Sequence, residues 1–152
     1  MNRKTYDSVI AAKYLLALAF QKGIVLNVTK VQKMLYIAYG YFLANHDYVI
    51  TAEEPKAWPY GPVFPRTRNK VKFDMVYKTS DPELVEIVSD ELVTQTFNNI
   101  IDKYAHYSAA QLSEWSHMDG GPWALTTKEN GFNWNEPIPN NYIKTYFKNI
   151  DV

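Results

Sequence analysis

The stretch VLNVTKVQKMLYIAYGYFLAN, residues 25–45, decides the class of fold. Its apolar residues recur at intervals of four, three and four, which is the spacing of one face of an α-helix. The members of this stripe are Val31, Leu35, Ala38 and Phe42. Asn27 or Thr29 is the expected N-cap, since a short polar side chain can accept a hydrogen bond from a free backbone N–H group of the first turn. The pattern therefore predicts a helix that buries this face.

Gly40 stands in the middle of this predicted helix, among the tyrosines at positions 36, 39 and 41. A glycine inside a helix costs about 1 kcal/mol relative to alanine. Such a residue is tolerated where it serves packing, so we expect that Gly40 permits close approach of another element.

Helical patterns extend along most of the chain. A first helix is expected between an N-cap at Asp7 or Ser8 and a stop at Gly23, in the usual order of polar start and glycine end. Further helical segments are expected at residues 62–73, 93–104, 108–117, around 125 and at 140–148, the last with Asn140 as its cap. The β-branched run at 47–51 predicts a short strand, and residues 81–88 fit either a strand or a helix start. The expected fold is mainly α: one compact helical domain, residues 1–152, with a short strand or hairpin.

The composition bounds the function. Sixteen basic and sixteen acidic residues cancel, whereas a nucleic-acid-binding protein normally carries a strong positive excess. Aromatic residues make up 15% of the chain, with 12 Tyr and 4 Trp, and these residue types suit interfaces. A basic run at Arg66, Arg68, Lys70 and Lys72 leaves a nucleic-acid-binding regulator as an alternative. The simpler interpretation is a solvated basic segment facing the acidic residues at 81–91.

The chain contains no cysteine, which excludes disulfides, thiolate catalysis and cysteine-ligated zinc. No run reaches the ~18 apolar residues that span a bilayer, and the N-terminus lacks the cleavage site of a signal peptide. We therefore expect a soluble cytoplasmic protein without a membrane partner.

The segment WPYGPVFP, residues 58–65, contains three prolines, one glycine and three aromatic residues. Each proline lacks a backbone donor and fixes φ, which excludes a regular helix or a central strand. We expect a stiff loop in which Gly61 and the prolines set a turn and Trp58 anchors it. Pro62 or Pro65 then suits the first turn of the next helix.

Motifs of enzymes are mostly missing. The glycines match neither a dinucleotide fingerprint nor a P-loop, and HExxH and GxSxG do not occur. The alternative is a hydrolase or metal-dependent enzyme that uses Ser113, Glu114, His117 and Asp119. Ser113 and His117 would share a helix face, but no oxyanion-hole motif accompanies them. We predict no enzyme, no cofactor and no metal, with His117 capping the C-terminus of its helix.

Three stretches, taken together, resemble a known family. They are KVQKMLYIAYGYFLA at 30–44, EEPKAWPYGPVFPRTRNKVK at 53–72 and LSEWSHMDGGPW at 112–123. In this order they look like the Panacea domain, the family of SocA-like antitoxins and phage-associated proteins of the genetic-element-protein type. The residues that match its motifs are Lys30, Lys33, Tyr36, Ala38, Gly40, Glu54, Ala57, Trp58, Tyr60, Gly61, Pro62, Val63, Pro65, Ser116, His117, Pro122 and Trp123. The loop before Pro122 and Trp123 is one residue longer than the family pattern.

The resemblance implies an antitoxin of a toxin–antitoxin module, often borne by a phage or prophage. Such a protein neutralises a cognate protein toxin by direct contact, or as an adaptor that delivers the toxin to a cytoplasmic protease. The identity of the toxin, the choice between these two modes and the formation of a homo-oligomer stay open.

Clustering of aromatic residues and prolines predicts the surface that meets the partner. Its expected members are Trp58, Tyr60, Phe64, Arg66, His117 and Trp123. The aromatic residues would be buried anchors, and Arg66 would contact a carboxylate or carbonyl directionally. Other motif residues are expected to serve the structure; these are Lys33, Tyr36, Gly40, Gly61, Pro62, Pro65 and Pro122.

Overall fold

The structure, a computed structural model, describes residues 3–152. Within them the chain is mainly helical, and its only sheet has two strands. The elements are α1 (Ser8–Gln21), α2 (Val28–His46), β1 (Lys56–Trp58), β2 (Gly61–Val63), α3 (Pro65–Lys70), a 3-10 turn (Pro82–Leu84), α4 (Val85–Val88), α5 (Glu91–Tyr104), α6 (Ala109–Ser116), α7 (Pro122–Thr127) and α8 (Asn140–Phe147). The expected class, mainly α with a small β element, is confirmed.

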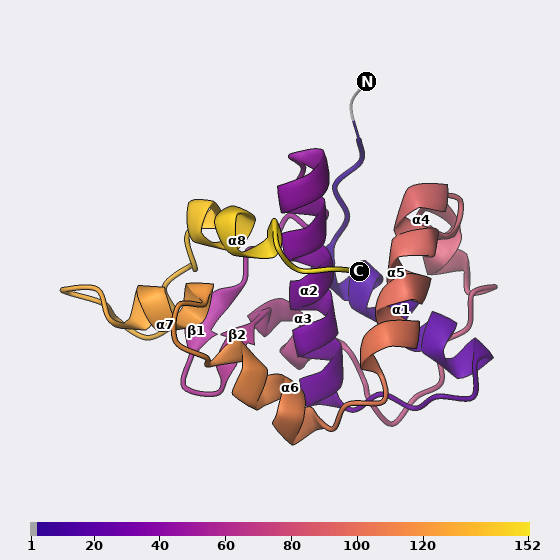
Figure 1. The fold of residues 1–152 in the computed structure, drawn as a ribbon. Helices are drawn as coiled ribbons and strands as arrows, with labels where there is room; N and C mark the ends of the chain where they lie inside the picture. Colours follow the sequence, from indigo (N-terminus) through magenta and orange to yellow (C-terminus); the bar gives the residue numbers. More distant parts are fainter. Residues whose placement is uncertain (1–2) are drawn as a thin grey trace.

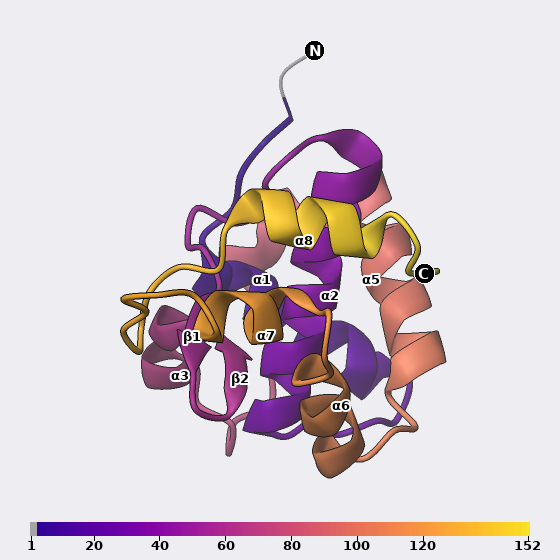
Figure 2. The same cartoon turned by 60° about the vertical axis from the view of Figure 1, so that its left-hand side comes forward.

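Helix α2 runs through the centre of the molecule (Figure 1). It packs against α1 and α5 on one side and against α6, α8 and β2 on the other (Figure 2). All four members of the predicted stripe are buried, from Val31 to Phe42. Because neighbours surround this helix, it is buried around most of its circumference.

The first two helices begin where their caps predict. The Asp7 carboxylate accepts a hydrogen bond from the N–H of Val9 at 2.8 Å, and the Asn27 side chain accepts one from the N–H of Lys30 at 2.9 Å. These bonds satisfy donors that a helix start leaves free. Gly23 follows the end of α1 with φ of 74°, the left-handed conformation that a helix stop favours.

Gly40 permits close approach, as predicted. A Cβ atom at this position would fall within the ring of Phe147 from α8. Figure 2 shows α8 lying across α2. Phe147 is fully buried, so the missing side chain at Gly40 sets how closely the two helices pack.

The strand predicted at residues 47–51 is wrong. Asp47 has φ of 51° and turns the chain after α2, and Thr51 forms only an isolated bridge with Tyr6. The sheet lies instead at residues 56–63, overlapping WPYGPVFP, where β1 and β2 pair antiparallel. Proline is accommodated at position 62 because Ala57, its partner in the pairing, bonds elsewhere. The N–H of Ala57 donates to the carbonyl of Glu136, and its C=O accepts from the N–H of Asn135. Pro62 therefore faces no backbone acceptor.

Two further boundaries differ from the expectation, and one open alternative is decided. Pro65 begins α3, as one alternative predicted, but the helix ends at Lys70 and does not reach residue 73. For residues 81–88, which fitted either a strand or a helix start, the second alternative holds: a 3-10 turn at Pro82–Leu84 leads into α4. Pro139, not Asn140, is the N-cap of α8, because the Asn140 side chain is engaged in accepting a hydrogen bond from the hydroxyl of Tyr39 at 2.8 Å.

In residues 3–152, no helix combines the length and the apolar character that crossing a bilayer demands.

Candidate partner-binding surface

Strands β1 and β2 are joined by a two-residue turn, Pro59 and Tyr60, at the centre of the most distinctive motif. Pro at the second position of such a turn and Gly at the fourth are typical of a type I turn. Gly61 has φ of 108°, which disfavours any side chain. A Cβ there would also lie 2.7 Å from Ser116 Oγ, so this position requires glycine for two reasons.

Lys33 of α2 binds the backbone of this turn. Its side chain is 2% exposed, and its ammonium group donates hydrogen bonds to the carbonyl oxygens of Tyr60 at 3.1 Å and Pro62 at 3.0 Å. No described carboxylate pairs with it. Burial without a counter-charge disfavours the charged form and lowers the pKa of Lys33 to about 8.

Residues that follow α6 hold the other side of the turn. The Nε2 atom of His117 lies 3.2 Å from the carbonyl oxygen of Pro59, and its Nδ1 atom lies 2.6 Å from that of Ser113. The His117 ring packs edge-on against Trp123, with centroids 4.2 Å apart. The indole N–H of Trp123 donates to the carbonyl of Trp58 at 2.8 Å. His117 also occupies the C-cap position of α6, as predicted.

The three motif stretches therefore meet at one hairpin. Side chains from α2, α6 and α7 engage the carbonyl groups of positions 58, 59, 60 and 62. Gln32 adds both a donor and an acceptor to the backbone of Phe64, at 3.3 and 2.7 Å. A turn held at so many points is rigid, and it presents its outer side chains in one fixed arrangement.

The hairpin and the segments beside it carry a group of aromatic side chains, which we call the aromatic face: the exposed Tyr60 and Trp134 and the half-buried Trp58 and Trp123. Tyr60 is 71% exposed and Trp134 is 53% exposed. The rings of Trp123 and Trp134 lie 6.3 Å apart, and the Trp58 indole donates to the side chain of Asn135 at 2.8 Å. Sequence reasoning missed Trp134, whose isolated position in the polar loop GFNWNEP was the available signal.

Two other predicted contact residues, Phe64 and Arg66, are engaged elsewhere, whereas His117 packs against Trp123 of this face. Phe64 is fully buried in the core, so it has no surface to offer a partner. The guanidinium group of Arg66 forms a two-point contact with the carboxylate of Asp7, at 2.9 and 3.2 Å. Arg68 is the cation that lies over the ring of Trp58, 5.8 Å from its centroid.

The cluster proposed for catalysis has other roles in this geometry. Ser113 directs its hydroxyl to the carbonyl of Tyr60, whereas His117 contacts the backbone of Ser113 rather than its hydroxyl. Asp119 pairs with Lys128 at 3.0 Å. Among residues 3–152, no three His, Asp or Glu side chains are grouped as metal ligands.

The residues of the basic run at 66–72 lie beside neighbouring side chains. Arg66 is paired with Asp7, and Arg68 lies over Trp58. Lys70 and Lys72 line a shallow depression together with Asp81 and Glu83, as the simpler interpretation of this segment predicted.

Comparison with known proteins agrees with this geometry. The chain matches the family model "Antitoxin SocA-like, Panacea domain" over residues 31–124, a range that includes most of α2, the hairpin, α6 and Trp123. The chain belongs to this family. It is 27% identical over 142 residues to Antitoxin SocA of Caulobacter vibrioides (strain NA1000 / CB15N), covering 86% of this chain and 75% of that protein. No solved structure matches the chain.

Proposed function

We propose that this protein is a non-enzymatic antitoxin that binds a protein toxin in the cytoplasm through its aromatic face. The observation that carries the proposal is the display of Trp58 and Tyr60 on a hairpin held by the family's motif residues, with Trp134 in the loop beside it. Tyr and Trp are the residue types that most often dominate binding energy at protein interfaces. The family membership supports a toxin as the partner.

Rigidity matters for this proposal because an interface loses less entropy on binding when its side chains are already ordered. Trp58 is held through Asn135, and the ring of Trp123 lies between His117 and Trp134. The motif residues Lys33, Gly61 and His117 would then act by positioning the face rather than by touching the toxin.

The test begins with the gene that lies beside this one, since antitoxins are usually encoded next to their toxins. The neighbouring product is co-expressed with the wild-type chain and with a Tyr60→Ala, Trp134→Ala double variant. We expect the variant to bind the toxin at least ~30-fold more weakly, the effect of losing about 2 kcal/mol at a central contact. Growth rescue should fall in parallel.

Met75→Ala is a matched control, because Met75 is as exposed as Trp134 (53%) but lies in the loop between α3 and the 3-10 turn. It should bind the toxin like the wild type. Full neutralisation by the double variant would exclude the aromatic face. Direct inhibition and delivery to a protease both require binding, and they are separated by the half-life of the toxin, which shortens only in the second mode.

A further inference from the structure

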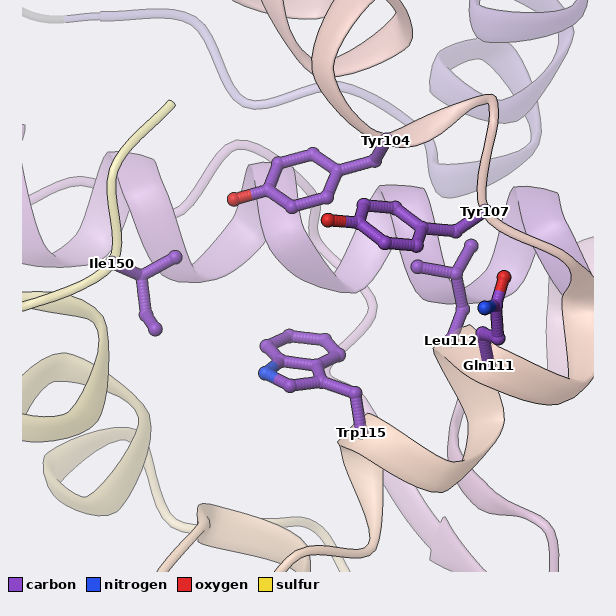
Figure 3. A pocket seen from close by; sticks show the side chains of 6 residues that line it. All are labelled: Tyr104, Tyr107, Gln111, Leu112, Trp115 and Ile150. Carbon is purple, nitrogen blue, oxygen red and sulfur yellow. The ribbon is translucent and has the colours of Figure 1, made fainter.

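A cavity lies on the far side of α6 from the hairpin, between the end of α5, α6 and the segment after α8 (Figure 3). Its volume is about 260 Å³. The lining residues are Tyr104, Tyr107, Gln111, Leu112, Trp115 and Ile150. Figure 3 shows the two tyrosine rings on one side of the space and the indole of Trp115 on the other.

The walls of this cavity are fixed by contacts behind them. Trp115 packs against the rings of Tyr36 and Phe147, with centroid distances of 6.0 and 6.2 Å. On the opposite side, the Tyr104 hydroxyl donates to the carbonyl of Asp151 at 2.7 Å, which ties the segment carrying Ile150 in place. The space between the rings is therefore part of the folded structure and not a product of loose side chains.

Three donor groups in the lining bond no acceptor within residues 3–152, and all three are open to solvent. They are the indole N–H of Trp115, the hydroxyl of Tyr107 and the amide N–H groups of Gln111, whose oxygen already accepts from the N–H of Ser108. All three can donate a hydrogen bond. An occupant of this site would gain most from an apolar body that carries an acceptor oxygen.

Size narrows the class of occupant. Pockets for drug-sized ligands and cofactors span roughly 300–1,000 Å³, whereas a cavity of ~150 Å³ already holds benzene. A volume of about 260 Å³ therefore suits one small aromatic group. We propose that this cavity is a binding site for a small planar aromatic group bearing a carbonyl or carboxylate oxygen, stacked between the tyrosine pair and Trp115. This site is independent of toxin binding by the aromatic face.

The test uses acetophenone and ethylbenzene, a pair of similar shape of which only the first has an acceptor oxygen. Each is titrated into the full chain while the indole N–H signals are followed by NMR. The chain has four tryptophans, and the signal of Trp115 is assigned with a Trp115→Phe variant. We expect saturable shifts of that signal with acetophenone at a Kd of roughly 0.1–1 mM, and weaker binding of ethylbenzene by about fivefold or more.

Variants test the aromatic walls and the indole donor of Trp115 separately. Tyr107→Ala, which removes one wall, should weaken acetophenone binding at least ~10-fold, whereas Tyr60→Ala, an exposed tyrosine on the hairpin, should leave it unchanged. Binding to the Trp115→Phe variant is followed by the NMR shifts of the probe itself. The preference for acetophenone over ethylbenzene should be smaller in this variant. N-acetylphenylalanine amide is titrated in parallel as a mimic of a side chain of a partner. Tighter binding of acetophenone indicates a free molecule, and tighter binding of the amide indicates a side chain. An unchanged Trp115 signal, or equal binding of the two probes to the wild type, would overturn the proposal.

Discussion

The indole N–H of Trp123 donates a hydrogen bond to the backbone carbonyl of Trp58 at 2.8 Å, across 65 positions of the sequence. The bond joins the start of α7 to the end of β1. It shows why two motifs that stand far apart in the chain belong to one structural unit. Each indole fixes the position of the hairpin while its ring contributes to the aromatic face.

Replacement of Trp123 by Phe should test the importance of this bond. The smaller ring still packs against His117, but the carbonyl of Trp58 loses its donor. We expect the free energy of unfolding to fall by about 1 kcal/mol, the usual net value of such a hydrogen bond. Urea unfolding at pH 7 measures it. The matched Trp134→Phe change, at an exposed indole with no acceptor among the described residues, should stay within ~0.5 kcal/mol of the wild type.

Gly61→Ala should be more costly than an ordinary glycine replacement. The left-handed backbone costs an alanine about 1–2 kcal/mol, and the new Cβ would lie 2.7 Å from Ser116 Oγ and 3.0 Å from Lys33 Nζ. We therefore expect a loss of roughly 2–5 kcal/mol, since overpacking adds a further ~1–3 kcal/mol. Gly120→Ala separates the two causes, because Gly120 also has a positive φ of 84° but no neighbour near its Cβ. Equal losses for the two variants would show that contact with Ser116 has no effect.

Much of the helical architecture could be predicted from the sequence because its signals are local. Asp7 and Asn27 cap their helices by hydrogen bonds within the next few residues. The strand at 47–51 was mispredicted because β-branched residues indicate only a tendency, and no second strand pairs with this segment beyond one bridge at Thr51. The hairpin could not be predicted from composition, since Ala57 bonds outward to residues 135 and 136, far away in the chain.

The composition of the candidate site was harder to predict for the same reason. The proline-rich segment located the turn at Gly61 correctly, but neither the strands on its two sides nor the way each side chain faces. Phe64 turns into the core because Gln32 binds both of its backbone groups. Arg66 is drawn to Asp7, 59 positions earlier, and Trp134 joins the face only through the folding of its loop against Trp123. None of these contacts leaves a periodic pattern in the sequence.

Gly40→Ala should destabilise the protein although alanine is the better helix former. Its Cβ would overlap the buried ring of Phe147, so α8 must shift from α2. Overpacking costs typically ~1–3 kcal/mol, and the gain in helix propensity offsets about 1 kcal/mol of it. A Gly40→Ala, Phe147→Leu double variant should be more stable than the sum of the single changes predicts, by about 1 kcal/mol or more. Strict additivity in thermal or urea unfolding would contradict direct contact.

Lys33 should give the protein a characteristic dependence of stability on pH. Burial lowers its pKa to about 8 in the folded state, from 10.5. Between these values Lys33 binds more protons in the unfolded chain than in the folded one, so its contribution to the free energy of unfolding rises with pH. Above pH 10 the trend reverses, because burial raises the pKa of Tyr39 and Tyr48 to about 12 and the folded state then retains protons that the unfolded chain releases.

The wild type should therefore gain on the order of 0.5–1 kcal/mol between pH 8 and pH 9, given about 1.4 kcal/mol per unit of pH for Lys33, and lose stability above pH 10. Lys33→Met removes the titrating group, so the rise should disappear while the loss above pH 10 remains. The change of stability with pH, rather than the stability at neutral pH, tests this variant. At neutral pH the loss of the buried charge stabilises Lys33→Met, whereas the carbonyl of Pro62 without its donor destabilises it. Urea unfolding across this range measures the slope. Lys128→Met, at an exposed lysine, should retain the rise, and a rise of wild-type size in Lys33→Met would assign the effect to another group.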